Sequence, residues 1–458
     1  MRRPILFLSG LRPNSVKNPD HSTGLVVSAN RHALKLWTAV ALTGVGTGIS
    51  AGVLYLLLQW VQHIGWPGVG SSLLKAASNA SFARHLLILL GAGFLTGLGQ
   101  LLLSGLSSGN GIDINAAIWF SAGRLPPVRT LGSAVLSILL VGMGVSLGRE
   151  GAPKQVGAIF GNLFATGAGL SDEQRRLLVA CGAGAGMSAA YGVPLGGALF
   201  SLEVLRGVLS LRLVLPALLA STIAALVAWL VVPNGPIYIF PAYENSAPVL
   251  VWTLLLGPIT GLVSVGYVRA IAWADRNKPR GWQRVAAPLI VMGLIGAVSF
   301  PFPQILGNGQ EISAMAFNGT VGPGLLACIL VLKPIATVMS IRSGAPGGLF
   351  TPSLTVGAMF GGILGYAWSL LWPGVPLGLY SVLGAAAMLA ATTQGPISTV
   401  VLVFELTGHN RSFVAPLLLA VISATLCARL IDPRSIYDAR LNDKQLAARI
   451  AARAPASD

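Results

Sequence analysis

The sequence has little charge, few acidic residues, and few cysteines or histidines. Charged residues make up 10% of the 458 residues, whereas a soluble globular domain carries about 25%. Hydrophobic residues reach 54%, and the mean hydropathy is +0.74. This composition predicts a polytopic membrane protein and excludes a soluble enzyme, a nucleic-acid binder and a disordered scaffold. The net charge of +16 does not indicate nucleic-acid binding, because the lysines and arginines flank apolar runs. These runs are continuous, which argues against the alternating strands of a β-barrel.

Side chains that bind metals or act as nucleophiles are scarce. Three cysteines, Cys181, Cys328 and Cys427, lie far apart in apolar segments, so we expect small core residues and no disulfide framework. The five histidines are dispersed, and the chain has no HExxH, CxxC or GxxxxGK[ST] pattern. We therefore predict a protein that is not an enzyme, with no catalytic residues, no metal ion and no cofactor other than a bound anion such as chloride.

Long apolar runs recur along the chain, and about 20 residues are needed to cross a bilayer. Several runs are too short to cross it straight, and many contain glycine or proline. This pattern is typical of half-helices and re-entrant segments that meet around a buried site. The predicted runs are 36–60, 86–106, 131–147, 213–232, 249–273, 286–302, 325–339, 356–372, 379–392, 396–406 and 413–430.

The basic residues predict an orientation. Clusters of them precede the first run, follow the last run and fill residues 276–284. The positive-inside rule therefore places both termini in the cytoplasm. The linker between the halves has no lysine or arginine, so we place it outside. The predicted domains are a basic cytoplasmic segment (1–35), a first transmembrane repeat (36–232), an extracytoplasmic linker (233–248), a second repeat (249–431) and a cytoplasmic tail (432–458).

The two halves share local patterns at an offset close to 200 residues. A Gly-Asn-Gly turn within 108–114 returns within 306–312, and the glycine cluster at 148–151 is matched at 347–350. Pro194 to Glu203 has the same spacing as Pro396 to Glu405. One half starts inside and the other outside, which indicates an inverted repeat with its substrate site at the midplane.

Glu150 stands in Gly-Arg-Glu-Gly-Ala-Pro at 148–153, within apolar, glycine-rich sequence. A charge inside a membrane is costly, so such a residue is a functional candidate. Pro153 is typical of a first helical turn, and a helix N-terminus attracts anions. We expect Glu150 to occupy an anion site, where a free anion displaces it and protonation weakens its hold. The simpler alternative is a first-turn glutamate that only favours the helix dipole.

Residues 343–352 repeat this design, with Pro352 just inside a second helix start. Flexible glycines there would let the N–H groups of Leu349 and Phe350 face a ligand; the alternative is a plain kink. A third turn, at 109–112, contains Asn110, whose amide offers two donors. Tyr437 lies beyond the last run and by pattern alone is an interfacial tyrosine.

Together these motifs resemble the CLC family of chloride channels and proton-coupled chloride transporters, over about residues 35–440. The resemblance rests on GREGAP at 148–153, SGAPGGLFTP at 343–352 and SIY at 435–437, in this order. Residues 181–205 and 390–408 are most similar to the bacterial ClcB-type branch. The resemblance implies an all-α polytopic membrane protein with two inverted-topology repeats of tilted, discontinuous helices. It also implies a homodimer with one pore in each subunit.

The resemblance assigns roles to individual residues. Glu150 would be the external gate, Leu349 and Phe350 would offer backbone N–H groups to a central anion, and Tyr437 would offer its hydroxyl from the cytoplasmic side. The anion-binding residues expected in this way are Asn110, Gly111, Ile112, Arg149, Gly151, Gly348, Leu349, Phe350 and Tyr437.

Two departures from the family pattern bear on the anion and the proton. Asn110 stands where the family has serine, and Asp113 replaces a proline, so the preference among chloride, nitrate and fluoride can differ. Val204 stands where well-coupled bacterial relatives carry a proton-handling glutamate. Valine cannot carry a proton, which favours channel-like or weakly coupled conduction, although a water path could still bring protons to Glu150.

Three further charged residues have expected roles. Lys154 departs from an apolar family position. It either adds positive charge one turn from Glu150, which attracts anions, or is a snorkelling surface lysine. Glu203 and Glu405 are interpreted as structural residues that cap or pair near a helix end.

The sequence thus predicts transport of chloride or a similar small inorganic anion across a bacterial inner membrane, through a pore gated by Glu150. The alternatives are a stoichiometric chloride/proton antiporter and a carrier that prefers nitrate or fluoride. A cation-coupled organic-solute transporter is disfavoured because few acids are available to bind sodium. An intramembrane enzyme is disfavoured because no Ser/His, His/Glu or paired Asp pattern is present.

Overall fold

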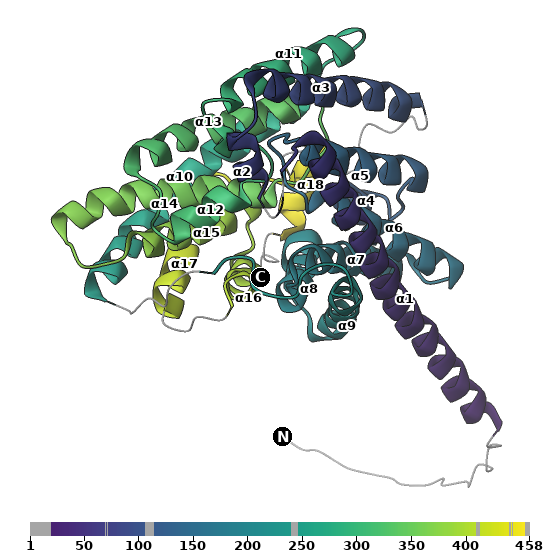
Figure 1. Cartoon of the computed structure of the whole chain (residues 1–458). Helices are drawn as coiled ribbons and strands as arrows, with labels where there is room; N and C mark the ends of the chain where they lie inside the picture. The colour runs from purple at the N-terminus through teal and green to yellow at the C-terminus, as the bar shows by residue number, and fades with distance from the viewer. Residues whose placement is uncertain are drawn as a thin grey trace, which may run out of the picture.

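The computed structural model describes residues 20–68, 70, 72–105, 114–239, 246–408, 413–438, 441 and 443–453, most of them in helices (Figure 1). Within these ranges the structure has no β-strand. The first half comprises α1 (Asp20–Gly65), α2 (Leu73–Ser78), α3 (Phe82–Gly105), α4 (Ile114–Phe120), α5 (Pro127–Gly142), α6 (Gly151–Gly167), α7 (Asp172–Tyr191), α8 (Pro194–Phe200), the π-helical turn η1 (Ser201–Arg206) and α9 (Leu211–Ala228). The second half comprises α10 (Ala247–Arg276), α11 (Gln283–Ser299), the 3₁₀ turn η2 (Pro303–Ile305), α12 (Gln310–Phe317), α13 (Pro323–Arg342), α14 (Phe350–Leu371), α15 (Leu377–Thr393), α16 (Pro396–Leu406), α17 (Val414–Ile431) and α18 (Asp443–Arg453).

Apolar helices of two lengths confirm the prediction of a multi-pass membrane protein. Among the described residues, seven helices are long and apolar enough to cross a membrane. Four more apolar helices are shorter, as expected for discontinuous segments. The long helices are α1 from Ala33, α3, α9, α10, α13, α14 and α17, and the short ones are α5, α11, α15 and α16.

Two buried helices, α6 and α7, were not predicted as apolar runs. Their contact surface consists of small residues, because the two backbones touch: a Cβ atom on Gly157 would overlap the carbonyl group of Gly182. The pair α14 and α15 is built in the same way, and a Cβ atom on Gly384 would lie 2.5 Å from the carbonyl oxygen of Gly357. Glycine and alanine at such interfaces permit close helix packing but lower the hydropathy of the segment.

The outer helices of each half form a matching parallel pair. Helix α1 runs alongside α9, and α10 runs alongside α17, with a glycine of the first helix against an alanine carbonyl group of the second. The same packing therefore recurs in both halves, which supports the internal repeat. The close approaches are Gly44 to Ala220, Gly48 to Ala224, Gly257 to Ala420 and Gly261 to Ala424.

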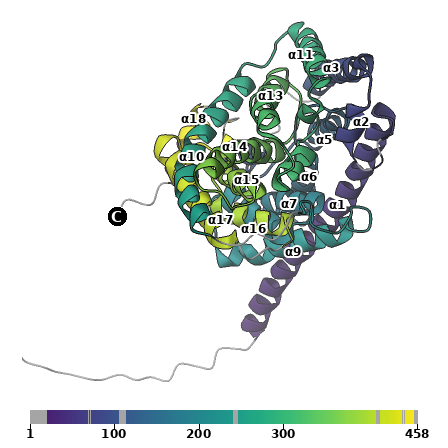
Figure 2. The same cartoon turned by 60° about the vertical axis from the view of Figure 1, so that its left-hand side comes forward.

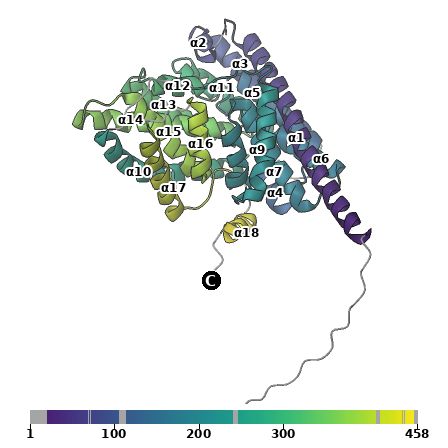
Figure 3. The same cartoon turned by 90° about the horizontal axis from the view of Figure 1, so that it is seen from below.

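The two halves run in opposite directions through the molecule. Helix α9 begins next to η1, where the carbonyl oxygen of Val204 accepts a hydrogen bond from Arg449 of α18. Arg269, near the end of α10, pairs at 3.1 Å with Asp432, which follows α17. Helices α1 and α9 thus start on the face that carries α18 (Figure 3), whereas α10 and α17 end there. The prediction of inverted-topology repeats is confirmed.

Equivalent helices of the two halves pack against each other across the boundary between the halves. Helix α3 packs on α11 (Figures 1 and 2), and α8 packs on α16. The second contact is reciprocal, because an acid from each half accepts hydrogen bonds from the first N–H groups of the opposite short helix. The prediction that Glu203 and Glu405 are capping residues is confirmed. The bonds are Glu405 with Leu195 N (3.0 Å) and Gly196 N (2.6 Å), and Glu203 with Ile397 N (3.1 Å) and Ser398 N (2.6 Å).

The cysteines are only partly core residues. Cys181 is buried, as expected, but Cys427 is half-buried and Cys328 is exposed. The expectation for Cys328 was wrong because an apolar helix in a membrane protein presents an apolar face outward as well as inward.

Candidate functional site

The site lies where the loop between α5 and α6 crosses the loop between α13 and α14. Gly148 and Gly348 form an antiparallel bridge, and each peptide N–H donates to the other residue's carbonyl oxygen at 2.8 Å. The bridge brings the N-termini of α6 and α14 together, one from each half. The N–H group of Gly348 is taken up by this bridge, although the sequence placed Gly348 among the anion ligands.

Glu150, directly before α6, is fully buried between these loops. Its Oε1 accepts a hydrogen bond of 2.8 Å from the peptide N–H of Phe350, the first residue of α14. Its Oε2 accepts one of 2.8 Å from the Tyr191 hydroxyl and a longer one of 3.4 Å from Thr351 Oγ1. The carboxylate therefore occupies the positive N-terminus of a helix, as an anion would.

The carboxylate of Glu150 is not bound by α6, the helix that Glu150 directly precedes. The sequence pointed to the N-terminus of α6, but Glu150 makes no capping bond there. Its backbone is helical, with φ −71° and ψ −15°, whereas a side chain that caps its own helix needs an extended backbone. The carboxylate instead crosses to α14 of the other half.

Two glycines form a cradle for the Glu150 carboxylate. A Cβ atom on Gly148 or on Gly348 would overlap carboxylate atoms, and for both glycines the three nearest atoms belong to Glu150. The glycines of the sequence motifs are thus required by the close approach of a side chain to the backbone.

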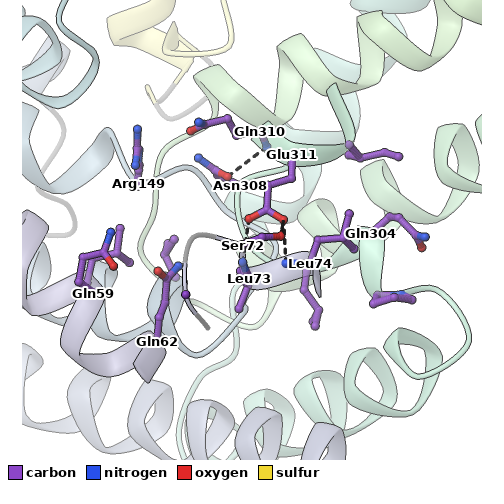
Figure 4. Close-up of a pocket in the computed structure, with 18 residues that line it drawn as sticks. Gln59, Gln62, Ser72, Leu73, Leu74, Arg149, Gln304, Asn308, Gln310 and Glu311 are labelled. Atoms are coloured by element: carbon purple, nitrogen blue, oxygen red, sulfur yellow. Dashed lines mark hydrogen bonds between the residues drawn. The ribbon is translucent and has the colours of Figure 1, made fainter. Parts of the chain in front are cut away.

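Arg149 lines a polar cavity of about 160 Å³ bordered by residues of α1, α2 and α12 (Figure 4). Figure 3 shows α2 and α12 on the side of the molecule opposite α18. The Arg149 guanidinium lies 5.2 Å from the centre of the Tyr191 ring, and its Nε has no hydrogen-bond partner among the described residues. Across the cavity, Glu311 accepts hydrogen bonds from residues 72–74, at the start of α2. The walls also include Gln59, Gln62, Asn308 and Gln310.

A smaller cavity of about 60 Å³ lies on the other side of Glu150, towards α18. Gly151, Lys154, Leu349 and Tyr437 are among the residues that line it. Lys154 is only 6% exposed, and its Nζ lies 3.3 Å from the Tyr437 hydroxyl. The alternative of a snorkelling surface lysine is therefore wrong.

A network of hydrogen bonds after α17 positions Tyr437. Asp432 accepts bonds from Arg434 Nε (2.8 Å) and Arg269 Nε (3.1 Å). Burial opposes ionisation, but these arginine bonds hold the pKa of the Asp432 carboxyl below its usual value. The peptide N–H of Ile436 donates to the Thr392 carbonyl at 2.7 Å. Tyr437 is thereby turned inward, with its ring 5.6 Å from that of Phe200.

The remaining predicted positions fall outside the described residues or at the edge of the site. Asn110, Gly111 and Ile112 lie outside the described residues. Val204 is 1% exposed, within η1, and its carbonyl oxygen accepts a 2.9 Å bond from Arg449. No titratable side chain stands at that position.

Three important residues escaped the sequence interpretation. Tyr191 is a hydrogen-bond partner of Glu150. A tyrosine at the end of an apolar, glycine-rich helix needs a partner when it is buried, and this is the signal that could have identified it. Lys333 is fully buried and donates to the carbonyl oxygens of Ile305 (2.8 Å) and Gly307 (2.7 Å), which braces the second-half Gly-Asn-Gly turn. Arg449 is 1% exposed and pairs with Asp438 at 2.8 Å, although its tail sequence looks fully solvated.

Comparison with known proteins gives relatives along most of the chain. Residues 92–429 match the family described as voltage gated chloride channel. A ClcB-like chloride channel protein of Ralstonia nicotianae is 33% identical over 399 residues, which cover 83% of this chain and 90% of that protein. The H(+)/Cl(−) exchange transporter ClcA of Salmonella arizonae is 28% identical over 439 residues, or 90% of this chain and 89% of that protein.

The fold has a solved counterpart. The crystal structure of a slow cyanobacterial Cl−/H+ antiporter superposes with a TM-score of 0.77 at 21% sequence identity. The match covers 91% of this chain and 98% of the antiporter chain. At this identity the likeness concerns the arrangement of the helices.

Proposed function

The chain belongs to the voltage-gated chloride channel (CLC) family, and from this premise we propose that it carries chloride or a similar small inorganic anion through a pathway gated by Glu150. One observation supports the gate above the others. A fully buried carboxylate occupies the N-terminus of α14 between two cavities that lie on opposite sides of it. An anion passing between the cavities has to take the place of that carboxylate.

The gate works through competition for the same donors. The ionised Glu150 carboxylate accepts from the Phe350 N–H and the Tyr191 hydroxyl. Protonation removes its charge, which weakens its attraction to the helix N-terminus. The side chain then leaves, and an anion gains the freed donors together with the α14 dipole. These donors replace part of the water that the anion loses on entry.

Arg149 and Tyr437 border the pathway on its two sides. Arg149 lines the cavity remote from α18 and offers fixed positive charge to incoming anions. Gly151, Leu349 and Tyr437 line the cavity towards α18, which supports our assignment of these residues to the anion-binding set. We assign Phe350, rather than Gly348, as the donor at the gate, because the Gly348 N–H is bonded to Gly148.

We propose that proton coupling is weak. Val204, at the position of the internal proton-handling glutamate, is apolar, and its backbone carbonyl is bonded to Arg449. The relatives include both a chloride channel protein and H(+)/Cl(−) exchange transporters. A stoichiometric chloride/proton antiporter, with protons reaching Glu150 through water, is therefore the second candidate.

The proposed setting is a bacterial inner membrane, with both termini in the cytoplasm. The basic clusters support this orientation, and the start of α1 shares a face of the molecule with α18. Homodimer formation is proposed from the family resemblance. No enzymatic activity and no cofactor other than the bound anion are proposed, since the relatives are named as transporters and channels.

Flux from reconstituted liposomes tests the function. We expect chloride efflux that speeds up on acidification, with little proton movement in the opposite direction. Protons driven uphill by a chloride gradient would favour the antiporter. Absence of flux for every small anion at any pH would refute the proposal.

A further inference from the structure

Lys154 places a buried positive charge inside the smaller cavity. It lies in the first turns of α6, and its backbone N–H bonds to the carbonyl of Glu150 at 3.3 Å. The side chain is 6% exposed, although lysine is almost never fully buried without compensation for its charge. Its Nζ lies 4.8 Å from the centre of the Tyr437 ring and 5.2 Å from that of Phe200. The rings hold the ammonium group at the wall of the cavity.

The cavity has the size and the lining of a site for a small anion. Its volume of about 60 Å³ exceeds the 10–15 Å³ or so that one water molecule needs. Leu349, directly before α14, lines one side, and the Tyr437 hydroxyl lies 3.3 Å from Lys154 Nζ. An ammonium group, a hydroxyl group and the residue before a helix N-terminus thus border one small space.

A second, larger cavity adjoins the smaller one and is also lined by positively charged residues. Its volume is about 360 Å³, and it shares Gln155 and Gly347 with the smaller cavity. Side chains with charge of one sign in a cleft raise the local concentration of ions of the opposite sign. Among the described residues of its wall, the basic ones are Arg129, Arg276, Lys278, Arg280 and Arg284, and Asp275 is the one acid.

We propose that Lys154 is a direct ligand of the transported anion, and that its ammonium group and the Tyr437 hydroxyl hold the ion in the cavity next to the gate. This inference rests on the proposed function and adds a specific ligand to it. The ligand class is a small monovalent inorganic anion, and chloride is the probe. A charged donor gives a stronger, charge-assisted contact than the neutral donors around it.

Chloride titration of the purified full chain by isothermal calorimetry tests the proposal. Lys154→Met keeps an unbranched apolar stem and removes the charge. We expect its Kd for chloride to rise about tenfold to a hundredfold, the usual value of one contact to a charged group. Lys154→Arg keeps the charge and should restore most of the affinity. Lys75→Met removes an equal charge at an exposed position and should leave the Kd unchanged.

The same titration in a Glu150→Gln background separates two roles for Lys154. If Lys154 binds the anion, Lys154→Met weakens chloride binding by a similar factor in both backgrounds. If it only holds Glu150 in place, the effect disappears when Glu150 is replaced, and the proposal is overturned. An unchanged Kd in a folded Lys154→Met variant also overturns it. If the wild-type chain neither binds nor moves chloride, the proposed function itself has failed.

Discussion

Replacing a single glycine should open the gate without any change to Glu150. In Gly348→Ala, the new Cβ atom would overlap both carboxylate oxygens, and the three nearest atoms all belong to Glu150. Gly348 has no positive φ, so alanine fits the backbone there. The end of a flexible side chain moves more readily than the backbone. We therefore expect the carboxylate to leave its place.

The size of the effect follows from the bonds that the carboxylate loses. It would give up its hydrogen bonds to the Phe350 N–H and the Tyr191 hydroxyl. Bonds to a charged group contribute about 1.5–3 kcal/mol each, so the occupied state would lose about 3–6 kcal/mol. Since 1.4 kcal/mol is about a factor of ten, occupancy of the site by Glu150 falls at least about a hundredfold.

The assay is chloride efflux from liposomes at pH 7.5 and at pH 4.5, with the membrane potential clamped. The wild-type chain should be slow at the higher pH and faster at the lower one. Gly348→Ala should be fast at both. Combining it with Glu150→Ala should add nothing, because both changes empty the same site.

Two further variants make this test decisive. In Gly148→Ala the new Cβ atom would overlap the same carboxylate, so this variant should behave like Gly348→Ala. Gly266→Ala, on α10, adds a Cβ atom to open space and should behave like the wild type. If folded Gly348→Ala and Gly148→Ala both keep the wild-type pH dependence, the cradle around Glu150 does not control the gate.

The remaining predictions concern the gate, the caps, the tail and the proton path. Glu150→Gln should abolish the pH dependence of flux while chloride still moves; persistent pH dependence with unchanged flux would show that another group is the gate. Glu203→Gln and Glu405→Gln each weaken two bonds to helix N-termini and should lower the free energy of unfolding by about 2 kcal/mol; a loss of proton coupling at full stability would assign these acids to transport instead. Asp432 has a depressed pKa, so its bonds stabilise the fold above its unfolded pKa of about 3.9 and lose their effect as the pH falls through the lower folded value. The difference in melting temperature between wild type and Asp432→Asn should therefore be present at pH 7 and shrink below about pH 4; a constant difference down to pH 3 would contradict this account. Val204→Glu adds a titratable group next to Leu205, which lines the smaller cavity, and should increase proton movement against chloride in the flux assay with pH recording; a folded, conducting variant with no added proton movement would place the proton path elsewhere.

Several parts of the fold could be predicted from the sequence because they depend on local patterns. Continuous apolar runs mark α3, α10 and α17 to within a few residues, since burial in lipid requires them. Helices α6 and α7 escaped this criterion because they pack on protein through glycine and alanine. The tail helix α18 escaped it as well, because Arg449 is buried by contacts with Asp438 and η1 that lie outside its own segment.

The candidate site also has parts that the sequence predicts and parts that it does not. Glu150, the glycines around it and the helix starts at 151 and 350 are visible as motifs, since proline and glycine mark helix boundaries locally. Tyr191 carries no motif. Its hydroxyl reaches Glu150 only because α7 folds back along α6.

The sequence by itself determined that the chain is an all-helical membrane protein, that its halves are related, and that an acid stands at a helix start. These properties follow from composition and from spacing along the chain, which folding does not change. Only the tertiary structure decided that Glu150 is held by α14 rather than by its own helix, that Glu203 and Glu405 cap each other's half, and that Lys154 lines a cavity. Each of these contacts joins residues from the two inverted halves, and an inverted packing brings together groups that no local pattern connects.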